Sequence, residues 1–123
     1  MWDGELMNYD GDDVPIFKTE HSLFRYMVEG RKFWDCRIRD MSDDRIYTLS
    51  FFDTVGPRPQ CPYVGFVDKE TGQLLIHDYR AMEFSDYAIN WCFLVLGLQQ
   101  YVSEPPPGEK EWYPVPFMNT RMT

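Results

Sequence analysis

The chain has 123 residues, of which 44% are hydrophobic and 17% aromatic. This suits one compact domain, and it excludes a wholly disordered chain or two cores of ordinary size. The formal net charge is −8, from 20 acidic and 12 basic residues. Since affinity for nucleic acids and anionic membranes rests largely on lysine and arginine, we expect no direct binding to either.

The cysteines predict a reducing compartment. Cys36, Cys61 and Cys92 are odd in number and lie far apart, without a C-x-x-C pair. That spacing is typical neither of a disulfide framework nor of a zinc site. The N-terminal residues do not have the pattern of a secretory leader, and the longest uncharged run, residues 87–103, is too short to cross a bilayer. We therefore expect a cytoplasmic protein.

The first elements expected are a helix and a hairpin. Residues 19–30 carry their apolar side chains on one helical face, with Thr19 as a cap and Gly30 as a stop. Residues 33–40 alternate between apolar and charged side chains, as in a half-exposed strand. A polar turn follows, and residues 46–52 have high β propensity, so the two segments predict a β-hairpin.

A second hairpin is expected after a proline-rich loop. Residues 63–67 and 73–79 are mainly apolar and include the β-branched residues Val64, Val67 and Ile76. The intervening turn ends in Gly72, which can adopt a positive φ.

The last element expected is a helix over residues 86–102, with Ser85 as its N-cap. It is apolar nearly all round, so the sheet, the first helix, the C-terminal segment, a second copy or a partner must cover it. The order α-β-β-β-β-α predicts an α+β domain, in which helices pack on one face of an antiparallel four-stranded sheet. We expect this core over residues 19–103, flanked by an acidic segment 1–18 and an aromatic, proline-rich segment 104–123.

No sequence motif identifies an enzymatic reaction. Histidine occurs only at His21 and His77, which lowers the odds of acid-base chemistry, and no nucleophile elbow, zinc motif or phosphate loop is present. The acidic run 10–13 does not fit a calcium loop, because Pro15 occupies the position that needs glycine and His21 the position that needs glutamate. We therefore predict no cofactor and no metal.

Acidic and large aromatic residues occur together near both ends of the chain. Exposed aromatic side chains make efficient binding anchors, and carboxylates accelerate encounter with a basic surface. The predicted partner-binding residues are Trp2, Asp10, Asp12 and Asp13, and secondly Glu109, Glu111 and Trp112. The leading hypothesis is a non-catalytic inhibitor that occludes a basic active site or nucleic-acid cleft of another protein, in the manner of small immunity, anti-defence or viral inhibitor proteins.

Two alternatives remain open at this stage. One is a small enzyme that uses His77 and Asp78 with a cysteine or carboxylate partner. The other is a structural or assembly subunit that forms a homodimer or larger oligomer through the expected helix 86–102.

Overall fold

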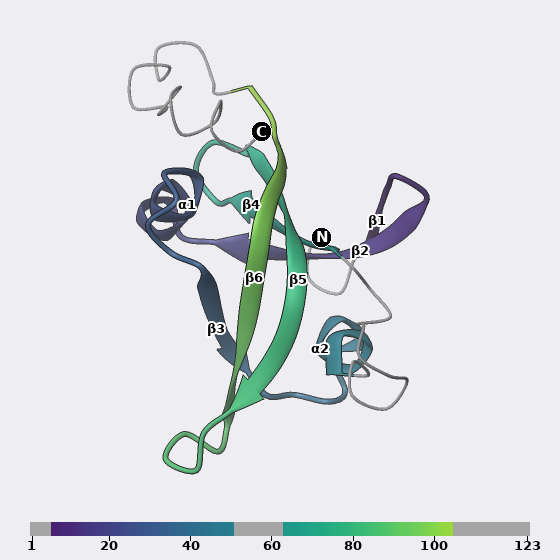
Figure 1. The fold of residues 1–123 in the computed structure, drawn as a ribbon, viewed down its shortest axis with the longest axis vertical. Coiled ribbons are helices and arrows are strands. Elements are labelled where there is room, and N and C mark those ends of the chain that lie inside the picture. The colour runs from purple at the N-terminus through teal and green to yellow at the C-terminus, as the bar shows by residue number, and fades with distance from the viewer. Residues whose placement is uncertain (1–5, 51–62, 105–123) are drawn as a thin grey trace.

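The computed structural model describes residues 6–50 and 63–104, which form six strands and two helices (Figure 1). In chain order these are β1 (Leu6–Tyr9), β2 (Asp12–Thr19), α1 (His21–Val28), β3 (Trp34–Ile38), α2 (Asp44–Leu49), β4 (Tyr63–Asp68), β5 (Leu74–Phe84) and β6 (Trp91–Val102). The strands form one sheet in the order β1-β2-β4-β5-β6-β3. Strands β2 and β4 are parallel, and the other neighbours are antiparallel. The α+β class is confirmed, but the expected four-stranded antiparallel sheet is wrong, since six strands form a mixed sheet.

Both helices pack on the same face of the sheet. Helix α1 contributes Phe24, Met27 and Val28 to the main core cluster, and α2 contributes Ile46 and Leu49. The strand residues of this cluster are Phe17, Val64, Phe66, Leu75, Tyr79, Met82, Cys92, Leu94 and Leu96. Burying a large apolar side chain contributes about 1.5–3 kcal/mol, so this cluster is the main source of stability. A second cluster, formed by Val14, Ile16, Val67 and Ile76, lies on the other face.

Two of the predicted elements are confirmed closely. The helix over 19–30 is α1, which ends before Gly30 with its φ of 76°, although Glu20 and not Thr19 precedes its first residue. The second hairpin is β4 and β5, and Gly72 adopts a φ of 78° in the turn between them.

The segment expected as a strand over 46–52 begins as helix α2. Asp43 caps it, because its carboxylate accepts a hydrogen bond from the backbone N–H of Arg45 at 2.9 Å. Ile46 and Leu49 then share one buried helical face. The cap and the burial of this face outweigh the β propensity of the segment. The expected pairing of 33–40 with 46–52 is therefore wrong, and β3 pairs with β6.

The expected helix 86–102 is also wrong, because the segment forms a turn and then the long strand β6. Cys92, Leu94 and Leu96 are buried in the main core, whereas Trp91 and the residues that alternate with them are more exposed. This period of two in burial fits a strand, but an apolar segment that is rarely interrupted by polar residues is equally compatible with a buried helix when only the sequence is known. The alternative of an oligomer interface on this helix therefore has no helix to support it.

The acidic segment 1–18 was expected to lie outside the core, and residues 6–18 contradict this. They form β1 and most of β2, and β2 carries fully buried Val14 and Ile16. Trp2 and the segment 105–123, including Glu109, Glu111 and Trp112, lie outside the described residues.

Candidate functional site

The β1–β2 hairpin brings together three of the acidic residues predicted to bind a partner. Asp10 and Gly11 form its tip with φ values of 53° and 87°, the left-handed pair that a two-residue type I′ turn requires. Asp10 and Asp13 are exposed, and Asp12 is half-buried. Figure 1 shows the tip of this hairpin projecting to the side, away from α1 and the long strands. Asp10 lies in this turn, and Asp12 and Asp13 are the first two residues of β2, so the three residues mark the end of one projecting hairpin, the "acidic tip".

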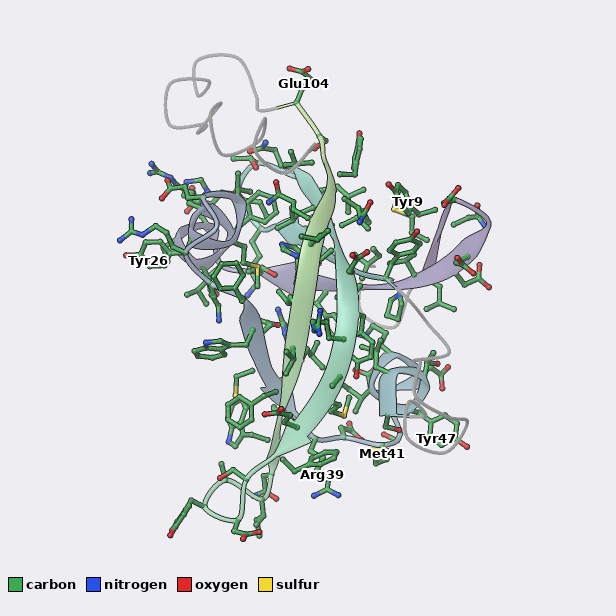
Figure 2. All side chains as sticks on the ribbon, in the orientation of Figure 1. Tyr9, Tyr26, Arg39, Met41, Tyr47 and Glu104 are labelled. Carbon is green, nitrogen blue, oxygen red and sulfur yellow. The ribbon has the colours of Figure 1, made fainter. Side chains whose placement is uncertain are left out.

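Tyrosines lie beside the acidic tip. The Tyr9 ring meets Tyr63 edge-on at 5.2 Å between centroids and lies 6.3 Å from Tyr101. Figure 2 shows Tyr9 beside the hairpin, on the side of the long strands. The Tyr63 hydroxyl donates to Asp10 Oδ2 at 3.5 Å. Desolvation, and secondly the Asp10 carboxylate, raise the pKa of Tyr63, so the phenol stays protonated and keeps its role as a donor.

An apolar surface covers the outward side of β3 and β6. Here β3 and β6 pair so that Trp34 lies opposite Val95, Cys36 opposite Phe93 and Ile38 opposite Trp91. Trp34, Ile38 and Trp91 are 50%, 62% and 43% exposed. The ring centroids of Trp34 and Phe93 lie 6.1 Å apart, and the Lys32 ammonium lies over the Trp34 ring at 3.8 Å from its centroid. We call Trp34, Ile38, Trp91, Phe93 and Val95 the "tryptophan face".

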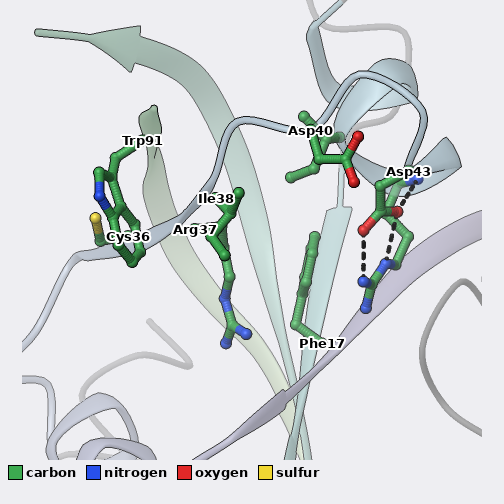
Figure 3. A pocket seen from close by; sticks show the side chains of 9 residues that line it. Phe17, Cys36, Arg37, Ile38, Asp40, Asp43 and Trp91 are labelled. Carbon is green, nitrogen blue, oxygen red and sulfur yellow. Dashed lines mark hydrogen bonds and ion pairs between the residues drawn. The ribbon is translucent and has the colours of Figure 1, made fainter. Parts of the chain in front are cut away.

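A pocket of about 360 Å³ opens beside β3. Its lining residues are Phe17, Cys36, Arg37, Ile38, Asp40, Asp43, Arg45, Ile46 and Trp91. Figure 3 shows Arg37 and Ile38 on one side of Phe17, and Asp43 on the other side. The guanidinium carbons of Arg37 and Arg45 lie 4.9 and 4.3 Å from the centroid of the Phe17 ring.

Both arginines of this pocket are already bound to acceptors in the chain. Arg37 donates from Nε to Asp35 and from Nη2 to Thr19 Oγ1 at 3.2 Å. Arg45 donates to both oxygens of Asp43, at 3.0 and 2.6 Å, and to the Ile16 carbonyl at 2.9 Å. The Arg45 bonds hold the pKa of Asp43 below its usual range. The pocket is therefore a braced junction of β2, β3 and α2, in which each guanidinium has a carboxylate partner.

The two histidines have separate surroundings. His77 is buried, and its Nδ1 lies 3.1 Å from the Gly97 carbonyl oxygen. The neighbouring Asp78 accepts instead from Gln100 at 2.9 Å. His21, at the start of α1, places Nδ1 at 2.7 Å from the buried carboxylate of Asp68. That pair fastens α1 to the end of β4, and the sequence had not indicated it because the residues lie far apart along the chain.

Neither described cysteine has the environment of a reactive thiolate. Desolvation raises the pKa of Cys36, and it raises the pKa of Cys92 to about 11. Within residues 6–50 and 63–104, no group of three or more histidine, cysteine or acidic side chains is arranged to hold a metal ion. In the same residues, no helix has both the length and the apolar character needed to cross a membrane.

Comparisons with family models, with curated proteins and with solved structures gave no match to this chain.

Proposed function

We propose that the protein is a non-catalytic, cytoplasmic inhibitor that binds another protein and occludes its basic active site or nucleic-acid cleft. The observation that carries this proposal is the acidic tip. Asp10, Asp12 and Asp13 lie at the end of one projecting hairpin, and their carboxylates can take positions that phosphates would occupy in a basic cleft.

The shape of the tip supports the proposal. A two-residue turn is narrow enough to enter a cleft, and its type I′ geometry fixes the backbone of the hairpin that carries the carboxylates, which reduces the entropy lost on association. The tyrosines beside the tip supply aromatic surface at the rim of such a contact. The net charge of −8 attracts a basic partner from a distance and repels nucleic acid itself.

The chemistry of the described residues supports a role in binding. His77 and Asp78, which the enzyme alternative requires to act together, have different hydrogen-bond partners. Burial keeps the Cys92 thiol protonated at neutral pH. The free thiols of Cys36 and Cys92 suit a reducing cytoplasm.

The test uses the tagged chain as bait in extract of its native cell, followed by association kinetics with the captured protein. Combined Asp10→Asn, Asp12→Asn and Asp13→Asn should slow association by about tenfold at low salt and flatten its salt dependence. The control variant combines Glu70→Gln, Glu83→Gln and Asp86→Asn, which removes the same charge from exposed positions elsewhere. If both triple variants associate equally slowly, net charge and not the position of the tip controls association. If neither variant associates more slowly than the native chain, the proposal is refuted.

A further inference from the structure

Strand β3 ends the sheet and leaves one edge unpaired in the part of the chain that the structure describes. Its ladder with β6 includes hydrogen bonds from Leu96 N–H to the Phe33 carbonyl at 2.9 Å and from Arg39 N–H to the Asn90 carbonyl at 2.8 Å. In an antiparallel pair, every second residue bonds across the ladder and the residues between them point the other way. The backbone N–H and C=O groups of Trp34, Cys36 and Ile38 therefore point to the free edge.

This edge lacks two of the features that protect edge strands from pairing, a bulge and a proline. Its five residue pairs with β6 run in one register without a bulge, and it contains no proline. Its charged side chains, Asp35 and Arg37, turn inward, where Asp35 is buried and Arg37 stacks on Phe17. In Figure 1, β3 is the outermost strand on its side of the molecule. A regular, exposed edge flanked by the tryptophan face favours the addition of another strand.

The sequence of this edge is complementary to itself. If two β3 strands pair antiparallel with Cys36 on a two-fold axis, each Asp35 lies opposite Arg37 of the partner subunit, and each Trp34 lies opposite Ile38 of the partner subunit. Moving the axis by one residue places Asp35 against its own copy, or Arg37 against its own copy. Of these three registers, only the one centred on Cys36 places opposite charges across the axis, where each Asp35–Arg37 ion pair within a chain meets that of the other copy.

We propose that β3 pairs with β3 of a second copy in this register, so that the two sheets become one continuous sheet across a two-fold axis. In this dimer, the N–H of each Cys36 donates to the carbonyl of Cys36 of the partner subunit. Each tryptophan face continues into that of the other subunit through the contact of Trp34 with Ile38 of the partner subunit.

Proline at position 36 tests the proposal directly. The Cys36 N–H points away from β6, so Cys36→Pro removes a donor of the dimer and no bond of the β3–β6 ladder, and proline is tolerated on edge strands in this orientation. Sedimentation equilibrium from about 1 μM to about 1 mM should show a dimer for the native chain. The dimer dissociation constant of Cys36→Pro should be about 25-fold higher than that of the native chain. Both Cys36 hydrogen bonds are lost, and each contributes about a factor of five. Cys36→Ser keeps the N–H and should dimerise as the native chain does.

A second pair of variants tests the register even if the proline variant does not fold. Trp34→Lys with Ile38→Lys places like charges opposite each other across the axis, whereas Trp34→Lys with Ile38→Glu places opposite charges there. Both positions are about half exposed or more, so the fold should tolerate either change. The Lys/Glu variant should dimerise at least tenfold more tightly than the Lys/Lys variant, because two facing pairs attract in the first and repel in the second. A native chain that stays monomeric, or two variants that associate equally, would overturn the proposal.

Discussion

Replacing Arg45 with methionine should destabilise the fold far more than its place in a short helix suggests. Methionine keeps the apolar length that packs on Phe17 but removes the guanidinium. Two hydrogen bonds to the Asp43 carboxylate and one to the Ile16 carbonyl are then lost, and the Arg45 side chain is only 10% exposed. Breaking such a desolvated ion pair costs about 3–5 kcal/mol, and partial exposure of Asp43 brings our expectation to about 3 kcal/mol.

Urea unfolding followed by circular dichroism measures this loss. With a slope of about 2 kcal/mol per molar urea, the midpoint should fall by about 1.5 M. Arg39→Met is the matched control, because Arg39 is exposed and lies 4.2 Å from the centroid of the half-exposed Phe84 ring, a contact worth less than about 1 kcal/mol.

A double-mutant cycle separates the ion pair from the loss of packing. Asp43→Asn retains a side-chain oxygen to cap α2, so the cycle of Asp43→Asn with Arg45→Met isolates the charged contact, and its coupling should be about 1–2 kcal/mol. A loss below about 1 kcal/mol in Arg45→Met, or no coupling in the cycle, would show that Arg45 does not brace β2 against α2.

Three further predictions concern packing and titration. Gly65→Ala should cost about 1–3 kcal/mol in urea unfolding, because its new Cβ would lie 2.4 Å from Cδ1 of fully buried Ile16, and an unchanged midpoint would mean that this cluster has room to adjust. The pKa of Asp43 is lowered by hydrogen bonds from Arg45, so its stabilising effect is present above the pKa of the unfolded chain, about 3.9, and is lost as the pH falls through the lower native value. Unfolding midpoints between about pH 5 and pH 2 should therefore fall less in Asp43→Asn than in the native chain, and parallel curves would contradict this. Burial raises the pKa of Cys92 to about 11, so the unfolded chain releases this proton first and stability should fall as the pH rises from about 8.5 towards 11, a decline that Cys92→Ala should lessen.

Local signals explain what could be predicted from sequence. The β4–β5 hairpin follows from two apolar segments and a turn ending at Gly72, whose positive φ the structure confirms. The dipeptide Asp10-Gly11 is also a turn signal, and it indicates a hairpin as strongly as the turn that ends at Gly72 does. The high charge of the first segment masked this signal, although the continuous apolar run from Val14 to Phe17 is typical of a buried strand.

The spacing of apolar side chains alone could not show whether the segment of β6 forms a helix or a strand. From Trp91 onward nearly every side chain is apolar, so helical and strand spacing are both satisfied. The aromatic and branched side chains at Trp91, Phe93 and Val95 favour a strand, and the length of the segment favours a helix. Pairing with both β5 and β3 decides the matter, and these contacts are distant in sequence.

The binding surfaces depended on these distant pairings to different degrees. The residues of the acidic tip were named from composition, and only the turn that gathers them was missing. The free edge of β3 could not be foreseen, because the expected hairpin with 46–52 would have paired that strand with the wrong neighbour. The β3–β6 pairing turns Trp34 and Ile38 outward beside an edge that has no partner strand among residues 6–50 and 63–104.

The two surfaces lie at opposite ends of the sheet, since β1 is its first strand and β3 its last. Pairing through β3 therefore leaves the acidic tip of each subunit outside the new interface, so the proposed dimer exposes two tips. Two tips on one particle would bind a target with two basic clefts far more tightly than one tip, provided that both can engage at once. Cys36→Pro, which lies away from the tip, should then weaken binding to such a target while the association rate of a single tip is unchanged. Loss of the association rate itself would instead mean that β3 contacts the target directly.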